Sequence, residues 1–286
     1  MIIGIESDGS LGDLIMLTSA LVTLRKKYPE AVIYLKIVGS FYDFFQGLAC
    51  VDHVGVTLPA TCDRYYNLHG VVSDPDFTEG FLHPSLRYHR ALELSQTLEP
   101  YQIPDMAEQE TYARERLPDT GYIACVLASH RPSANWSARG WKELFLLLPG
   151  EKFVLFGSSP RPSVNVPLKE NHPSDFYDLP NVLDFTGQTT QRQGAALMKR
   201  CRICISVDTG FFHVASALQI PTILLAAAAP GWCRAPLFTP TLVLQGQSKY
   251  YPCAHSIHGC CERNPGPHCL EWVTPEIIIE NLKRFK

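Results

Sequence analysis

The segment CISVDTGFFHVASALQIP, residues Cys204–Pro221, changes from one type of secondary structure to another at its centre. Its first part belongs to the short run Ile203–Val207, which is rich in β-branched residues and typical of a buried strand. An Asp-Thr-Gly turn follows at 208–210, and beyond it small and apolar residues recur at helical spacing, with His213 in the first turn. The segment therefore predicts a strand that stops at this turn and passes directly into a helix.

Strand-like and helix-like segments alternate on both sides of this turn. The strand-like runs are MIIGIE, AVIYLKIV, HVGVTL, YIACVLAS, KFVLFGS, NVLDFTG, CISV, TILLAA and TLVLQG. We expect helices at Leu11–Lys27, Phe41–Leu48, Leu86–Leu98, Gly140–Leu147, Thr190–Lys199, Gly210–Leu218 and Pro275–Phe285. Such alternation is the signature of an α/β protein with mostly parallel sheets covered on both faces.

The pattern restarts at Tyr122, after the polar stretch DMAEQETYARERLPDTG. A chain of 286 residues is long for one domain, so we expect two α/β domains, residues 1–117 and 118–286, with a cleft between them.

Composition and charge exclude several classes of protein. A hydrophobic content of 46% with 19% charged residues is typical of a globular protein, and a net charge of −3 argues against nucleic acid as the main partner. No apolar run approaches a membrane span, and the N-terminus lacks a basic region and a cleavage site. We expect a cytoplasmic protein. The basic clusters Arg25–Lys27 and Lys283–Lys286 leave open a peripheral contact with the inner membrane.

The Asp-Thr-Gly turn has the chemistry of a phosphate-binding site. In open α/β sheets ligands bind beyond the carboxyl ends of strands, where the following helix presents backbone N–H groups and a partial positive charge. Gly210 allows close approach of an anion, and Thr209 and His213 add donors. We predict a diphosphate cradle. The alternative is that Asp208 or Thr209 only caps the helix and His213 packs nearby.

A second turn, SDGSLGD, joins the first strand to the first helix. Ser10 and Asp13 have the spacing of a capping box, with Asp in the position usually held by Glu or Gln. The alternative is that Asp13 lies at the mouth of the cleft and acts as a general base.

These stretches together carry a resemblance. GDLIMLTSALVTLRKKYPEAVIYL, and FTGQTT followed by MKRCRICISVDTGFFHVASALQIPTILL, resemble the ADP-heptose:lipopolysaccharide heptosyltransferase family. The resemblance covers the first 38 residues and most of Tyr122–Leu225. It implies an inverting glycosyltransferase of the GT-B fold, with two Rossmann-like domains whose parallel sheets face a central cleft. Residues 1–117 would form the acceptor side and residues 118–286 would bind the nucleotide sugar.

The resemblance also implies roles for single residues. Asp13 would deprotonate the acceptor hydroxyl, and Arg139 would neutralise the leaving phosphate. Ser129 would lie near the phosphates, and Gln188 and Thr189 would shape the nucleotide pocket. The diphosphate and the sugar would be held by Asp208, Thr209, Gly210 and His213.

The implied reaction moves a sugar, heptose in this family, from a nucleotide diphosphate such as ADP-heptose to a hydroxyl of a lipopolysaccharide or another glycan. It requires no metal, because the helix dipole and an arginine supply the positive charge. We read Asp74-Pro75-Asp76 as a turn rather than as a metal-binding pair. Two alternatives stay open: a nucleotide-sugar epimerase, and a catalytically silent protein that binds a nucleotide sugar or joins an assembly.

Two regions depart from the family. The first domain is short, and Ser158–Arg161 replace an acidic residue suited to ribose, so adenosine is implied by the resemblance alone. The segment 253–269 is rich in cysteine and histidine, with thiols at Cys253, Cys260, Cys261 and Cys269. Structural zinc or iron, disulfides and thiols that bind nothing are all open, because the spacing lacks a Cys-x₂-Cys pair. Trp136 and Trp141 are candidates either for stacking on a base or sugar or for the core, and His130 is a further candidate near the cleft.

Overall fold

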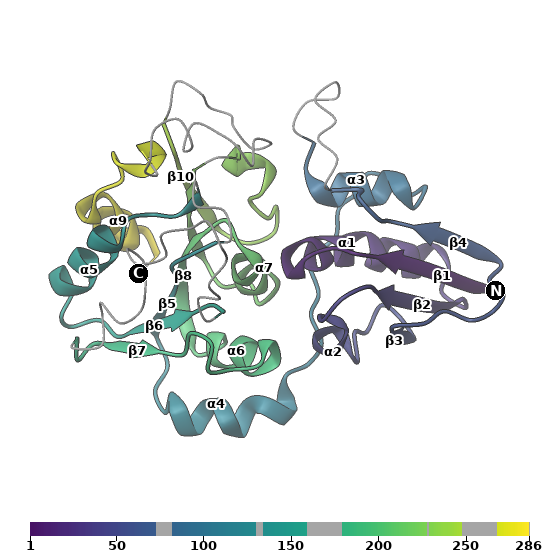
Figure 1. Cartoon of the computed structure of the whole chain (residues 1–286), viewed down its shortest axis with the longest axis horizontal. Coiled ribbons are helices and arrows are strands. Elements are labelled where there is room, and N and C mark those ends of the chain that lie inside the picture. The colour runs from purple at the N-terminus through teal and green to yellow at the C-terminus, as the bar shows by residue number, and fades with distance from the viewer. Residues whose placement is uncertain (73–81, 130–133, 159–178, 228, 248–267, 286) are drawn as a thin grey trace. The chain divides into compact units, whose positions relative to one another are not determined.

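The computed structural model describes residues 1–72, 82–129, 134–158, 179–227, 229–247 and 268–285. The chain divides into two compact units, Met1–Met106 and Ala107–Lys286 (Figure 1). The sequence placed the division later, at 117/118. Residues 107–116 go with the second unit because they form the short helix η2 (Ala107–Gln109) and the helix α4 (Glu110–Arg116), and α4 contacts α6 (Gln191–Met198).

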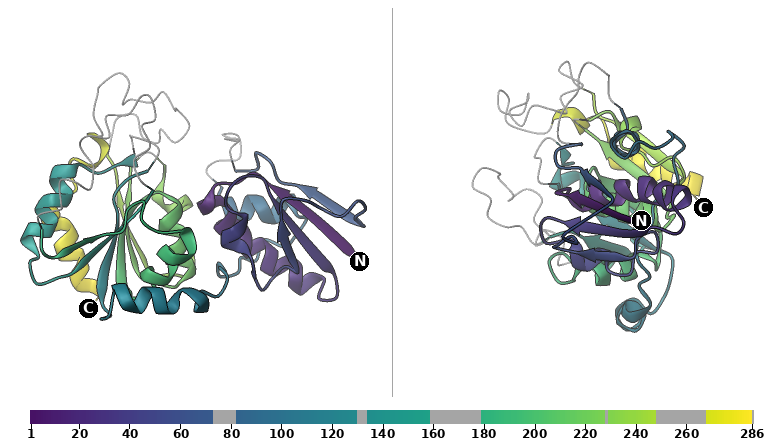
Figure 2. Two further views of the ribbon diagram at one scale, coloured as in Figure 1. Left: turned by 60° about the horizontal axis from the view of Figure 1, so that its bottom comes forward. Right: turned by 90° about the vertical axis from the view of Figure 1, so that its right-hand side faces the viewer.

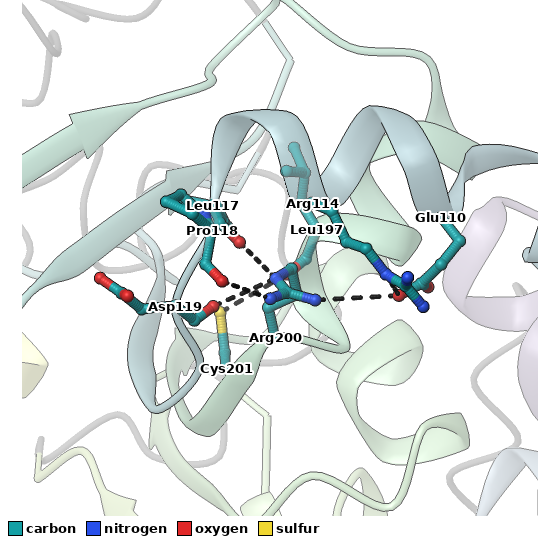
Figure 3. Close-up of polar contacts among 8 residues, drawn as sticks. All are labelled: Glu110, Arg114, Leu117, Pro118, Asp119, Leu197, Arg200 and Cys201. Carbon is teal, nitrogen blue, oxygen red and sulfur yellow. Dashed lines mark hydrogen bonds and ion pairs between the residues drawn. The ribbon is translucent and has the colours of Figure 1, made fainter.

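One arginine fastens this connecting segment to the second unit, as Figure 3 shows. Arg200, which directly precedes β8 (Cys201–Val207), donates from Nε to the carbonyls of Leu117 and Asp119 and from a terminal nitrogen to the carbonyl of Pro118 at 2.8 Å. Its other terminal nitrogen lies 3.8 Å from the carboxylate of Glu110. The polar stretch near which the sequence placed the domain boundary thus belongs, from Ala107 on, to the second unit.

The first unit has a parallel sheet of order β3-β2-β1-β4, and three helices lie among its described residues. Its strands are β1 (Ile2–Ser7), β2 (Val32–Ile37), β3 (His53–Gly55) and β4 (Arg64–Asn67). Its helices are α1 (Leu11–Lys27), α2 (Tyr42–Phe45) and α3 (Pro84–Ala91). Helices α1 and α3 contact each other, and the buried hydroxyl of Ser85 in α3 donates to the carbonyl of Met16 in α1. The buried residues Ile3 and Ile5 of β1 belong to the core of this unit.

The second unit is a six-stranded parallel sheet of order β10-β9-β8-β5-β6-β7. Its further strands are β5 (Tyr122–Val126), β6 (Phe153–Phe156), β7 (Val182–Asp184), β9 (Thr222–Ala226) and β10 (Thr241–Gln245). Its further helices are α5 (Ala138–Leu147), α7 (Gly210–Ala217), η6 (Gly231–Cys233), η7 (His268–Leu270), α9 (Pro275–Leu282) and η8 (Lys283–Phe285).

Both faces of this larger sheet are covered. In Figure 2, left, α5 and α9 lie along one face and α6 and α7 along the other. Ile203, Ile205 and Val207 of β8 join the core with α5 and α9, and a separate cluster joins Phe212 of α7 to Leu224 of β9. Two buried faces are the usual environment of a parallel sheet, so the expected α/β class is confirmed.

The predicted helices agree with the structure where caps and apolar spacing coincide. The helix Leu11–Lys27 has the predicted bounds, and α9 begins at Pro275 after Thr274 as expected. The predicted helix Leu86–Leu98 is too long, because α3 ends at Ala91 and Glu93 has a left-handed φ of 55°. The prediction for Phe41–Leu48 is also too long, because only the single turn of α2 forms.

One strand and one α-helix of the described chain escaped the sequence analysis. Strand β4 has the sequence RYYN, in which three of four residues are exposed, so no apolar run marks it. Helix α4 lies in a stretch with many charged residues, and of its seven residues only Ala113 is buried. Among the residues that the structure describes, no helix has the length and apolarity to cross a membrane.

Candidate functional site

Each of the two turns singled out in the sequence follows one of the two strands that flank the strand reversal of its sheet. In the second unit the chain runs from β5 to β6 and β7 on one side and then returns to β8 on the other side of β5. In the first unit it runs from β1 to β2 and β3 and then returns to β4 on the other side of β1. Such reversals leave a crevice at the carboxyl ends of the two central strands, where ligands of open α/β sheets bind.

Ser129 and the Asp-Thr-Gly turn lie at the reversal in the second unit. Strands β5 and β8 are neighbours, with Val126 beside Ser206, so the residues that follow each strand leave the sheet at the same edge. The backbone of Ser129 is held by Asn135, whose Oδ1 accepts from the Ser129 N–H at 2.7 Å. Asn135 is buried and was not a candidate in the sequence, since it lies in a loop without a motif.

The turn between β8 and α7 keeps its helix start free of a side-chain cap. Thr209 occupies the N-cap position in an extended conformation, with φ of −157° and ψ of 169°, yet in the described chain its side chain makes no capping hydrogen bond. The first-turn N–H groups of a helix have no acceptor inside the helix and attract an anion. The alternative that Thr209 serves as an ordinary cap therefore finds no hydrogen bond to support it.

Asp208 and His213 flank this helix start in different ways. His213 lies in the first turn of α7, is only 2% exposed, and its ring meets that of Phe212 edge-on at 4.8 Å between centroids. The Asp208 carboxylate forms an ion pair with Arg234, with 3.7 Å between Oδ2 and Nε. Arg234 follows η6 and carries no motif. The sequence analysis missed it because the contact joins the loops after two neighbouring strands, β8 and β9.

Arg139 lies in the first turn of α5, after the β5 edge. The turn has its own cap, because Ser137 Oγ accepts from the N–H of Gly140 at 3.0 Å. Arg139 is exposed and lines an open hollow of about 480 Å³ together with Ala138, Lys142, Glu143 and Leu146. It is thus available to a ligand as a cation on the helix surface.

Trp136 and Trp141 belong to the hydrophobic core of the second unit, which is one of the two roles that the sequence left open. They are 3% and 0% exposed and meet edge-on at 5.0 Å, and Trp136 donates to the carbonyl of Val273. A β-carbon on Gly140 would approach Trp136 to 2.6 Å, so glycine is required for this packing.

Gln188 and Thr189 follow β7 and precede α6. The exposed Gln188 donates from its amide to the carbonyl of Asp184 at 2.9 Å. Thr189 lies beside Gly194, where a β-carbon would come within 3.3 Å of the Thr189 hydroxyl and 2.7 Å of the Phe211 ring. The half-buried Phe211 of α7 stacks on Phe156, with 5.9 Å between centroids. An aromatic pair therefore borders the residues predicted to shape the nucleotide pocket.

The turn between β1 and α1 is closed by its own side chains. Asp13 Oδ2 accepts from the N–H of Ser10 at 3.1 Å and from the Ser10 hydroxyl at 2.6 Å. The capping box predicted from the spacing is confirmed. A β-carbon on Gly9 would lie 3.4 Å from the Tyr88 hydroxyl and 3.0 Å from Asp13, so α3 packs Tyr88 close under this turn. Burial, with the nearby Asp13 carboxylate adding to it, raises the pKa of Tyr88 well above its usual range.

A charged cluster lies at the same edge of the first sheet. The Glu6 carboxylate of β1 pairs with Lys36 of β2 and with His69 after β4, each at 3.1 Å, and accepts from Tyr65 at 3.2 Å. The hydrogen bond from Lys36 is the main cause that holds the pKa of Glu6 below its ordinary value. These groups supply both signs of charge near the first turn.

Several predictions fall outside the described residues. They concern Cys253, Cys260, Cys261, His130 and the pair Asp74 and Asp76, so the metal, disulfide and turn interpretations stay predictions. Cys269 is described; it is buried in the core of the second unit. Within the described ranges no group of three or more His, Cys, Asp or Glu residues is arranged to hold a metal ion.

Comparison with known proteins identifies the family to which the chain is similar. Residues 85–255 match glycosyltransferase family 9 (heptosyltransferase), a range that includes Ser129, Arg139 and the β8–α7 turn but begins after Asp13. A lipooligosaccharide heptosyltransferase 2 of Haemophilus ducreyi is 30% identical over 143 residues. That match covers 48% of this chain and 38% of the relative, which is less than half of either length.

Solved structures match over nearly the whole chain. The family 9 glycosyl transferase of Veillonella parvula has a TM-score of 0.81 at 18% identity, covering 99% of this chain and 96% of that one. The ADP-heptose lps heptosyltransferase II of E. coli has a TM-score of 0.74 at 18% identity, covering 100% and 98%. Together with the two parallel sheets, these matches confirm the predicted GT-B fold.

Proposed function

Because the chain belongs to glycosyltransferase family 9, the heptosyltransferases, we propose that it transfers heptose from ADP-heptose to a hydroxyl of a lipopolysaccharide or a related glycan. The observation that carries the donor part is the β8–α7 turn, where a helix start without a side-chain cap lies at the strand reversal of the second sheet. The E. coli relative named for ADP-heptose motivates the choice of donor.

In this proposal the second unit binds the donor. The N–H groups at the start of α7 and the Thr209 hydroxyl would hold the diphosphate, with Asp208 and His213 oriented toward the sugar side of that group. Arg139 and Ser129 would meet the phosphates from the β5 side, and Gln188 and Thr189 would border the nucleoside. Positive partial charges fixed before the reaction stabilise the charge that grows on the leaving oxygen.

The first unit would supply the base. The acceptor oxygen attacks the anomeric carbon of the sugar, and the bond from that carbon to the diphosphate oxygen breaks as the new bond forms. The acceptor proton passes to Asp13, the diphosphate leaves as ADP, and attack from the opposite face inverts the anomeric centre. General-base catalysis of this kind contributes about 10²–10⁴-fold to a rate. We expect no requirement for a divalent metal and a cytoplasmic location, with any membrane contact peripheral.

A thermal-shift panel with ADP, GDP, UDP and CMP tests the donor class. A ligand that binds only the folded protein stabilises it by about 2.7 kcal/mol at one hundred times its dissociation constant. We expect ADP to raise the melting temperature and the other nucleotides to have smaller effects. If none of the four changes the melting temperature, the proposed function is wrong.

A silent nucleotide-sugar-binding protein is the second candidate, and one observation favours it. The Asp13 carboxylate is engaged by Ser10 in a capping box, so its place in the structure is explained without catalysis. Incubation with ADP-heptose and a deacylated lipopolysaccharide acceptor separates the two candidates. Release of ADP that depends on the acceptor supports the enzyme, and nucleotide binding without any release supports the silent protein.

A further inference from the structure

A carboxylate at a diphosphate-binding turn requires a compensating charge. Asp208 directly precedes Thr209, the N-cap of α7, so its negative charge lies beside the helix start that would attract an anion. A diphosphate and an uncompensated carboxylate that lie close together repel each other, and the repulsion grows as both groups leave bulk water. The turn therefore binds a diphosphate well only if another group offsets the charge of Asp208.

Arg234 is placed to offset it. Its Nε lies 3.7 Å from Asp208 Oδ2, and each of the two side chains is only 17% exposed. Ion pairs that are largely shielded from solvent are screened less by salt than exposed pairs. A guanidinium also keeps its positive charge at all ordinary pH values, so it offsets the carboxylate throughout the range in which the protein is folded.

The loop that carries Arg234 is fixed by contacts to the sheet. The Gln245 amide at the end of β10 donates to the carbonyl of Ala226 at 2.8 Å, and its oxygen accepts from the N–H of Gly231 at 2.7 Å. The N–H of Arg234 in turn donates to the Gly231 carbonyl at 3.0 Å. A β-carbon on Gly231 would come within 2.2 Å of Val243, so this close contact requires glycine.

The opposite end of β8 provides a matched comparison. Arg202 at the amino end of the strand pairs with Glu151 at 2.8 Å, with side-chain exposures of 28% and 29%. Parallel strands bind ligands at their carboxyl ends, so this second pair is remote from the proposed donor site although it lies on the same strand.

We propose that Arg234 is a positioning residue of the donor site: its pairing with Asp208 offsets the carboxylate charge and makes the β8–α7 turn receptive to a diphosphate. This inference rests on the proposed function for the identity of the nucleotide. The charge argument itself applies to any diphosphate and is tested without a nucleoside.

Calorimetric titration of the full chain with ADP and with inorganic pyrophosphate tests it in four variants. Arg234→Met removes the charge, and we expect at least a tenfold loss of affinity for both ligands. Arg234→Met combined with Asp208→Asn removes both charges, and we expect it to bind pyrophosphate at least threefold more tightly than Arg234→Met alone. Arg234→Lys keeps the charge without the fork and is expected to fall between wild type and Arg234→Met. The control Arg202→Met is expected to change affinity by less than twofold.

The outcomes are distinct. Unchanged affinity in Arg234→Met overturns the inference, and so does a double variant that binds no better than Arg234→Met, since a structural role alone gives no rescue. If Arg234→Met does not fold, the neutral and polar Arg234→Gln takes its place, alone and combined with Asp208→Asn, and the same two comparisons decide the question. Pyrophosphate binding that depends on Arg234, without binding of any nucleoside diphosphate, supports the inference and contradicts the proposed function. If wild type binds neither ADP nor pyrophosphate, both are wrong.

Discussion

The β1–α1 turn and the β8–α7 turn both lie at a strand reversal, but their carboxylates have different kinds of partner. Both connect a strand beside a sheet reversal to a helix, and both contain an aspartate. In the first turn Asp13 is bonded by Ser10, three residues away, and the helix start is completed by its own side chains. In the second, Asp208 pairs with the distant Arg234 and no side chain caps the helix. The difference indicates which turn stabilises its own helix and which retains donors for a ligand.

The largest effect that we expect follows from changing Asp13 to Asn. The amide keeps an oxygen that accepts from Ser10, so the helix start is retained, but it cannot take a proton. Transfer to an acceptor should fall by about 10²–10⁴-fold, the usual contribution of a general base. Rate measurements under saturating donor, with ADP affinity as the control, test this. Undiminished transfer would show that the first turn serves the helix alone.

The second effect concerns the start of α7, whose N-cap side chain makes no capping hydrogen bond among the described residues. The variant Gly210→Asp places a negative charge in this first turn. Acidic residues in the first turn stabilise a helix by about 0.3–1 kcal/mol, so the melting temperature without ligand should hold or rise. The same charge should repel a diphosphate and lower ADP affinity by about tenfold or more. A variant that loses stability and affinity together would indicate damage to the fold and not competition for the helix start.

A smaller effect is expected on the free energy of unfolding when the N-cap side chain of each turn is removed separately. Removing an engaged N-cap side chain costs about 0.5–2 kcal/mol, so Ser10→Ala should lower the free energy of unfolding by that amount. Thr209→Ala should change it by less than about 0.5 kcal/mol, because the Thr209 side chain makes no capping bond. Urea unfolding of the two variants without ligand measures both values. Equal losses would contradict the contrast between the turns.

The smallest effect is a pH dependence at the end of β1. The pKa of Glu6 is held below its ordinary value, chiefly by the hydrogen bond from Lys36, so folding favours the charged form. Its contribution to stability is present above the ordinary glutamate pKa and is lost as the pH falls through the lowered one. Thermal melts from pH 6 to pH 3 should therefore show a smaller decrease for Glu6→Gln than for wild type. Parallel curves would show that the Glu6 cluster adds nothing measurable.

The sequence predicted well where local signals agree with the fold. The first helix is bounded by the Ser10 and Asp13 spacing at one end and basic residues at the other, and both bounds match. The strand ending at Val207 and the helix starting at Gly210 were also visible, because the period of apolar residues changes abruptly there. These local signals are sufficient to identify both turns from the sequence alone.

Contacts between residues that are remote in the chain could not be predicted from the sequence. Arg234 reaches Asp208 only because β8 and β9 are neighbours, and Tyr88 reaches the first turn only because α3 packs on α1. No periodicity encodes either contact. The charged helix α4 was missed for a related reason: its attachment depends on Arg200, which is remote in the chain.

That attachment has a practical consequence for cutting the protein into independently folding pieces. Arg200 is bound to three successive carbonyls at 117–119, so a fragment of the second unit that starts at Tyr122 would expose a guanidinium stripped of its acceptors. A fragment that starts at Ala107 keeps these acceptors and α4. A fragment of the second unit should therefore start before α4, even though the polar composition of this segment is typical of a linker.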